Sequence, residues 1–185
     1  RQSEYVDPKS GGSARLTISA YENLFSTAER RLLLTKDKNT FIRISDVYGV
    51  VPAITGKIEL VYEGEQEGPS KVANILTSKA IKKVFTELFP SPEKARKSQE
   101  KNPYQTIINW FSKNTLDLMT VSSTKEYFEQ LDKVKGLKEF IEKYYPDVDK
   151  NKGYLLMEFV LHGLAEFSML SKFKLETGVQ FKDML

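Results

Sequence analysis

The sequence predicts an all-α fold, in which a helical N-terminal subdomain precedes an irregular helical bundle. Apolar residues recur at three- and four-residue steps in several long segments, as on the buried face of a helix. Prolines, glycines and Ser/Asp caps separate these segments. The only short alternation, Phe41-Ile-Arg-Ile44, is expected to be an extended connection at most. No strand is therefore expected.

The first predicted helix runs from about Ser13 to Leu34 and follows a flexible Ser-Gly-Gly break. Arg15 lies in or just before its first turn, where a cation is unfavourable because the helix dipole prefers negative charge. A nucleotide phosphate outside the helix would explain this arginine, and a solvated surface arginine is the alternative. The expected buried face contains Leu16, Tyr21, Leu24, Phe25, Ala28 and Leu32.

The next segment contains short helices and then a boundary. Ser45-Asp46 is expected to cap a helix over 47–51, and Pro52 to open another that continues to Tyr62. The segment 63–70 has two glycines, a proline and three acids, so it is expected to end that helix. We therefore predict two domains, residues 1–66 and residues 67–185.

The second domain is predicted to be helical throughout. The segment 93–102 is expected to be a loop or an exposed helical turn, and 114–123 is ambiguous. The last long helix is apolar nearly all round and should lie at the centre of a bundle, with the tail 172–185 docked against it. Helices are predicted over 71–89, 104–113, 124–134, 137–145 and 153–170.

Composition narrows the class of protein. A chain of 185 residues with 40% hydrophobic and 29% charged residues forms one sizeable core or two small ones. The lack of cysteine excludes disulfides and thiolate sites, and fits a cytoplasmic protein. The net charge of +3 is too small to indicate nucleic acid. No signal-peptide pattern and no apolar stretch of membrane-spanning length is found, so no membrane partner is expected.

Two side-chain groupings are candidates for chemistry. Glu158, His162 and Glu166 are spaced four residues apart on one helical stripe, which could hold a metal. The preferred interpretation is a polar seam paired with basic groups, so no metal ligand is assigned. The segment 71–101 contains eight basic residues and three acidic ones. It could meet an acidic partner or a nucleic-acid backbone, although a solvated helix face is the default.

Several motifs together resemble a known family. They are Ser13-Ala-Arg15, Ala28-Glu-Arg-Arg31, Ile44-Ser-Asp46 and Val50-Val-Pro-Ala-Ile-Thr-Gly-Lys57. Their order resembles the lid subdomain of AAA+ ATPases, in the branch of MoxR and the magnesium chelatase ATPase subunit. The segments 54–68 and 155–167 are similar to the C-terminal region of bacterial proteins labelled magnesium chelatase or sigma-54-interacting ATPase.

The resemblance implies a role for one residue. Arg15 would be the sensor 2 arginine, reaching the γ-phosphate of ATP held with Mg²⁺ by a missing AAA+ core domain. Further implied partners are neighbouring subunits of a ring oligomer and an unknown client protein. Relatives often carry an arginine after a histidine where Gly56-Lys57 stands here, which leaves the role of Lys57 open.

The sequence contains no phosphate-loop motif and no Gly-x-Gly-x-x-Gly turn, so the chain alone is not expected to be an enzyme. Because it starts with Arg1 and not with Met, we expect a fragment of a longer protein, and a processed N-terminus is the alternative. One alternative is a non-catalytic helical interaction module that binds an acidic partner or nucleic acid through residues 71–101. The other is a metalloenzyme built on the Glu158 stripe.

Overall fold

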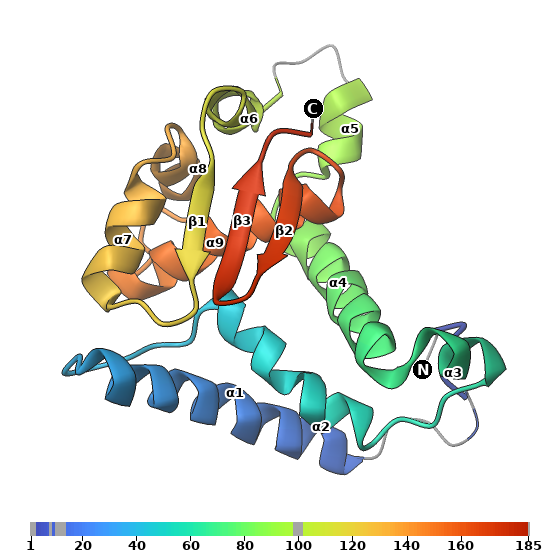
Figure 1. Cartoon of the computed structure of the whole chain (residues 1–185). Coiled ribbons are helices and arrows are strands. Elements are labelled where there is room, and N and C mark those ends of the chain that lie inside the picture. Colours follow the sequence, from blue (N-terminus) through green and yellow to red (C-terminus); the bar gives the residue numbers. More distant parts are fainter. Residues whose placement is uncertain (1–2, 8, 10–13, 98–101, 185) are drawn as a thin grey trace.

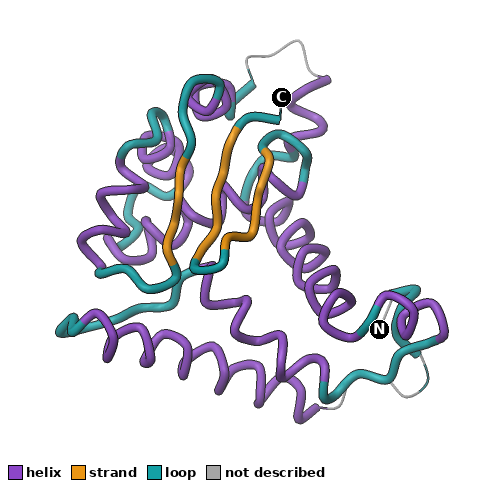
Figure 2. The backbone as a smooth tube through the Cα atoms, viewed as in Figure 1, coloured by secondary structure: helices purple, strands orange, loops and turns teal. Residues whose placement is uncertain are grey.

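The computed structural model describes residues 3–7, 9, 14–97 and 102–184. It is mostly helical and contains a small antiparallel sheet (Figures 1 and 2). The helices are α1 (Ala14–Thr35), the 3-10 helix η1 (Ile44–Val50), α2 (Val51–Thr55), α3 (Tyr62–Glu67), α4 (Pro69–Leu88), α5 (Pro92–Lys97), α6 (Gln105–Phe111), α7 (Thr124–Asp132), α8 (Leu137–Tyr144) and α9 (Lys150–Glu166). The strands are β1 (Leu116–Met119), β2 (Ser171–Leu175) and β3 (Gly178–Lys182).

The long helices predicted from the sequence are confirmed, and their ends follow from local caps. α9 begins three residues earlier than predicted because the Asp149 carboxylate accepts the Lys152 N–H at 3.1 Å. It ends at Glu166, shortly before Ser168 takes a positive φ of 53°. α7 begins with a capping box, in which Ser123 and Glu126 satisfy each other's backbone N–H groups.

The expectation that the chain has no strand is wrong. β1 comes from the segment left ambiguous, and the C-terminal tail forms the hairpin β2–β3. The strand order is β1-β3-β2, and Leu116 and Leu118 of β1 stand opposite Phe181 and Val179 of β3. These four side chains are buried on the face that α9 crosses, behind the strands in Figure 1. Strands of four or five residues give too short an alternation to stand out in the sequence.

The predicted helix from Pro52 to Tyr62 is also wrong in its second half. α2 ends at Thr55, and Val6 and Leu60 form an isolated antiparallel bridge. The chain is therefore extended around Leu60, just before α3. α3 itself occupies most of the segment 63–70, which the sequence predicts only to end the preceding helix. Gly68, at φ 84°, ends α3 and turns the chain directly into α4.

The buried face of α1 differs from the predicted one. Ala28 is buried, but Tyr21 and Phe25 are 63% and 41% exposed. α1 packs on η1 and α2 along one side only, below the sheet in Figure 1. The apolar stripe read from the sequence is therefore wider than the strip of the helix that the rest of the chain covers.

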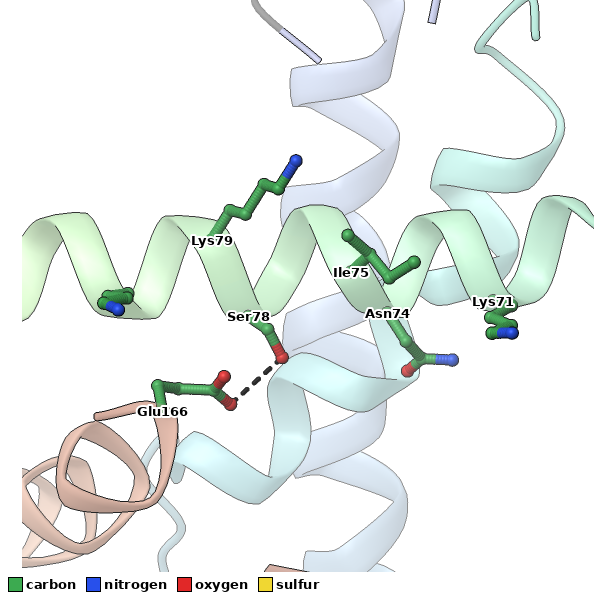
Figure 3. Close-up of a pocket in the computed structure, with 7 residues that line it drawn as sticks. Lys71, Asn74, Ile75, Ser78, Lys79 and Glu166 are labelled. Carbon is green, nitrogen blue, oxygen red and sulfur yellow. Dashed lines mark hydrogen bonds between the residues drawn. The ribbon is translucent and has the colours of Figure 1, made fainter. Parts of the chain in front are cut away.

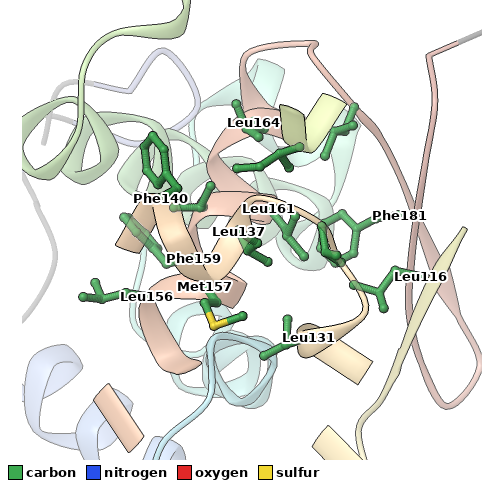
Figure 4. Close-up of a cluster of buried hydrophobic side chains, with 14 of the residues drawn as sticks. Leu116, Leu131, Leu137, Phe140, Leu156, Met157, Phe159, Leu161, Leu164 and Phe181 are labelled. Carbon is green, nitrogen blue, oxygen red and sulfur yellow. The ribbon is translucent and has the colours of Figure 1, made fainter. Parts of the chain in front are cut away.

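α9 lies at the centre of the main core, as predicted. Leu161 and Leu164 are fully buried, and Figure 4 shows side chains of α7, α8, β1 and β3 gathered around this helix. The Phe85 ring of α4 contacts the rings of Phe159 and Phe167 at centroid distances of 5.9 and 5.8 Å. α4 and α9 are thus joined by aromatic packing.

The closest approach between α4 and α9 depends on Gly163, which lies directly against Phe85. A Cβ at position 163 would fall 2.7 Å from Phe85 Cγ, closer than real Cβ atoms come. We expect Gly163→Ala to lower the free energy of unfolding by about 1–3 kcal/mol, because the packed ring must shift. Urea denaturation followed by circular dichroism measures this loss.

The matched control is Gly153→Ala in the same helix. A Cβ there meets only Val148 Cγ1 at 3.5 Å, an ordinary contact. This variant should be unchanged or more stable by up to about 1 kcal/mol, because alanine favours helix. Equal stability of the two variants would contradict the packing argument.

Candidate functional site

Arg15 lies where the sequence predicts it, in the first turn of α1. The residue is exposed, and the first turn of α1 contains no acidic residue of its own. α1 begins at the edge of the molecule in Figure 1, away from the sheet and the main core. A partner bound at this end could therefore contact the first turn of the helix.

The other half of α1 is fixed by a buried ion pair. Arg31 Nη1 pairs with Asp46 Oδ1, and both side chains are almost completely buried. Arg31 Nη2 also donates to the Phe41 carbonyl at 2.6 Å, and Asp46 Oδ2 accepts the Arg43 N–H at 2.8 Å. Burial raises the pKa of Asp46, and the Arg43 N–H and Arg31 offset this only in part.

The Asp46 interactions correct the predicted helix cap. Ser45-Asp46 was expected to precede a helix over 47–51, but the 3-10 helix η1 already begins at Ile44. Asp46 lies inside this helix and binds the backbone of Arg43 before it. The motifs Ala28-Glu-Arg-Arg31 and Ile44-Ser-Asp46 are therefore held together through Arg31 and Asp46.

Arg43 is a buried cation that no pattern in the sequence distinguishes from an exposed arginine. Its Nη1 donates to Ser122 Oγ at 2.9 Å, and its guanidinium lies 4.2 Å from the centroid of the Tyr127 ring. Burial, and secondarily the nearby Arg31, lower the pKa of Arg43 to about 10, so it remains charged at neutral pH.

Glu158 of α9 is fully buried and caps η1 from the opposite half of the chain. Its carboxylate accepts the N–H groups of Ile44 and Ser45 at 2.7 and 3.0 Å, and the Tyr127 hydroxyl at 2.8 Å. Burial alone would raise the pKa of Glu158. His162 and these donors outweigh that effect and lower it.

His162 lies beside Glu158, with Nε2 3.7 Å from Oε1. Tyr48 Oη lies 3.4 Å from His162 Nδ1 and accepts a hydrogen bond from Lys172 Nζ at 3.1 Å. Since the Tyr48 oxygen accepts a hydrogen bond from Lys172, we assign its own O–H as the donor to His162 Nδ1. The proton of the neutral ring then lies on Nε2, which faces Glu158 beyond hydrogen-bond distance. Burial lowers the pKa of His162.

The predicted stripe of Glu158, His162 and Glu166 is divided among different partners. Glu166 Oε1 accepts a hydrogen bond from Lys172 Nζ at 2.6 Å. It also accepts one from Ser78 Oγ at 3.0 Å, the bond drawn in Figure 3. Among the residues that the structure describes, no group of three His, Cys, Asp or Glu is arranged to hold a metal ion. The polar-seam interpretation fits these contacts, because Glu166 pairs with a basic residue on β2.

The basic segment 71–101 is partly neutralised. Lys71 pairs with Glu67, and Lys79 and Lys82 pair with Glu4 and Glu93, each at 3.4 Å. Figure 3 shows Lys71 and Lys79 on α4, on either side of Ser78. Lys101, which also belongs to this basic segment, lies outside the described residues. None of the helices described here is long and apolar enough to cross a membrane.

Comparison with protein-family models, curated proteins and solved structures finds no match to this chain. Function must therefore be argued from the residues themselves. Glu158 and His162 are fully buried, so they cannot reach a substrate in this conformation. Glu158 and His162 instead attach η1 to α9. Arg15, the predicted nucleotide-contact residue, is exposed.

Replacing Glu158 tests the capping role. Glu158→Gln keeps the shape but removes the charge that three donors share, so we expect the free energy of unfolding to fall by about 2–4 kcal/mol. Glu166→Gln on the same helix breaks a more exposed pair and should cost about 1 kcal/mol or less. Urea denaturation compares the two. Equal losses would show that Glu158 is not a special anchor.

The single histidine predicts a pH dependence. Because the pKa of His162 is lowered in the folded chain, the unfolded chain binds a proton first as pH falls below about 6.5. Stability should therefore drop by about 1 kcal/mol between pH 6.5 and 5.5, a drop that His162→Gln should remove. Asp46, whose raised pKa acts in the opposite direction, is present in both proteins. Parallel pH profiles of the two proteins would refute the assignment to His162.

Proposed function

We propose that this chain is the C-terminal part of an AAA+ ATPase similar to MoxR and the magnesium chelatase ATPase subunit. In this proposal α1, η1 and α2 belong to the lid, and Arg15 is its sensor 2 arginine. The observation that carries it is the position of Arg15, exposed in the first turn of a 22-residue helix. An arginine suits the role because its planar guanidinium makes directed bonds to phosphate oxygens.

The packing of α1 supports a coupling role for the lid. Arg15 and Arg31 lie on one continuous helix, and Arg31 is fixed to η1 through Asp46. η1 is in turn capped by Glu158 of α9. A displacement of the Arg15 end by nucleotide would therefore tilt a helix whose other end is tied to the main core.

ATP and Mg²⁺ would be held by the core domain and would supply the γ-phosphate. The contribution of this chain would be one positive charge placed against that phosphate. The helices and sheet of residues 67–185 would contact a neighbouring subunit of the ring or a client protein. Without a phosphate loop, the 185-residue chain itself should not hydrolyse ATP. A cytoplasmic location belongs to the same proposal.

The test is Arg15→Ala in the full-length ATPase. We expect ATP hydrolysis to fall at least about tenfold, because a donor to the transferred phosphate is lost. Arg15→Lys should be intermediate, since it keeps the charge but loses the fork. Lys83→Ala, which removes an exposed cation from α4, is the matched control and should leave turnover unchanged. Wild-type hydrolysis by Arg15→Ala with an intact circular dichroism spectrum would refute the sensor assignment.

The alternative is a free-standing interaction module that uses residues 71–101. It has less support because Lys71, Lys79 and Lys82 already pair with acids. Binding of the chain to an acidic polymer or nucleic acid, weakening steeply with added salt, would favour this alternative. A gene that encodes a phosphate loop upstream of Arg1 would favour the ATPase.

A further inference from the structure

A cavity of about 450 Å³ opens where α1, η1, α4 and the β2–β3 hairpin meet. Its lining includes Arg30 of α1, Tyr48 of η1 and two lysines of β2, Lys172 and Lys174. The volume lies in the range of small-molecule sites. Arg30 is fifteen residues beyond Arg15 on the same helix, about 22 Å along its axis, so this cavity is separate from the proposed nucleotide contact.

The cavity has an excess of positive charge. Arg30, Lys172 and Lys174 line it, against the single acid Glu176. Glu166 neutralises Lys172 through a 2.6 Å ion pair. Within the described part of the chain, neither Arg30 nor Lys174 forms an ion pair with a carboxylate. Arg30 and Lys174, neither of which is paired with an acid of the described chain, therefore line a cavity in which Glu176 is the one carboxylate among the described lining residues.

Lys172 and Lys174 are placed by the sheet register. They are two residues apart on β2, so they point to the same face of the strand. Their partners on β3 are Phe181 and Val179, both buried on the inner face. The two lysines therefore lie on the inner face of the sheet and line the same cavity as Arg30 of α1.

Three of the side chains that line the cavity, Ser78, Tyr48 and Lys172, are held in place by hydrogen bonds already described. Ser78 and Lys172 both donate to Glu166, and Lys172 also donates to Tyr48. Tyr48 is joined to His162, which is fully buried. Such fixed groups lose little conformational entropy when a ligand binds.

We propose that this cavity binds a small organic anion through a phosphate group. A phosphate carries up to two charges and three acceptor oxygens, which suits Arg30, Lys174 and the one remaining proton of Lys172 better than the two oxygens of one carboxylate. Ser45 and Thr120 also line the cavity, and their hydroxyls make no hydrogen bond with the described residues. Leu175 and Val179 form an apolar wall for the organic part of the ligand.

The test is calorimetric titration of the 185-residue chain with adenosine monophosphate as the probe. Arg30→Ala and Lys174→Ala should each weaken binding about tenfold or more, because each removes a charged donor. Both side chains are exposed, so the fold should survive, which circular dichroism checks. Lys83→Ala outside the cavity is the charge-matched control and should bind like the wild type. Amide resonances of Gly49 and Gly178, which line the cavity, should shift on titration.

Several outcomes would overturn the proposal. They are absence of binding, equal binding by the wild type and both cavity variants, and loss of binding in Arg15→Ala instead. Adenosine or citrate binding as tightly as adenosine monophosphate would refute the phosphate preference. The inference does not depend on the ATPase proposal, because failure of the Arg15→Ala hydrolysis test would leave the binding of this probe by the isolated chain unaffected.

Discussion

The arrangement of this chain depends on the carboxylate of Glu158, which is fully buried yet ionised. A buried charge is tolerated only when donors surround it, and here the donors come from η1 and α7. The N-terminus of η1 is satisfied by a residue more than a hundred positions away in the sequence. The segment that carries Asp46, and through it Arg31 and α1, is thereby fixed to the main core.

The sequence predicts the long helices well because their signals are local. The caps of α7 and α9 lie within three residues of the N–H groups that they satisfy, and the apolar pattern of α9 repeats over its full length. The strands are missed because β1 pairs with β3 some sixty residues later in the chain. The residues of either short segment do not indicate which distant segment it pairs with. Tyr21 and Phe25 are misplaced because periodicity shows that a helix has an apolar side, not how much of it is covered.

The candidate site is predictable to a smaller extent. The place of Arg15 in the first turn of α1 is predicted from its position ahead of the apolar face, and the Glu158 stripe from its four-residue spacing, while the role of Arg15 stays a prediction. Neither signal could show that Glu158 would bind backbone N–H groups of η1, or that Lys172 would meet Glu166, since both depend on tertiary packing. The buried Arg43 had no sequence signal, because an arginine in a short extended segment is ordinarily exposed.

The strand order also bears on synthesis at the ribosome. β3 is the middle strand and lies between β1 and β2, although it comes last in the chain. A nascent chain can form α4 and α9 before β3 is synthesised. β1, however, has no strand to pair with until β3 has left the exit tunnel. Until then Leu116 and Leu118 lack their cross-strand neighbours Phe181 and Val179, so the growing polypeptide exposes an unpaired strand edge, which is prone to aggregation. Closure of the sheet is thus a late event that marks completion of this part of the protein.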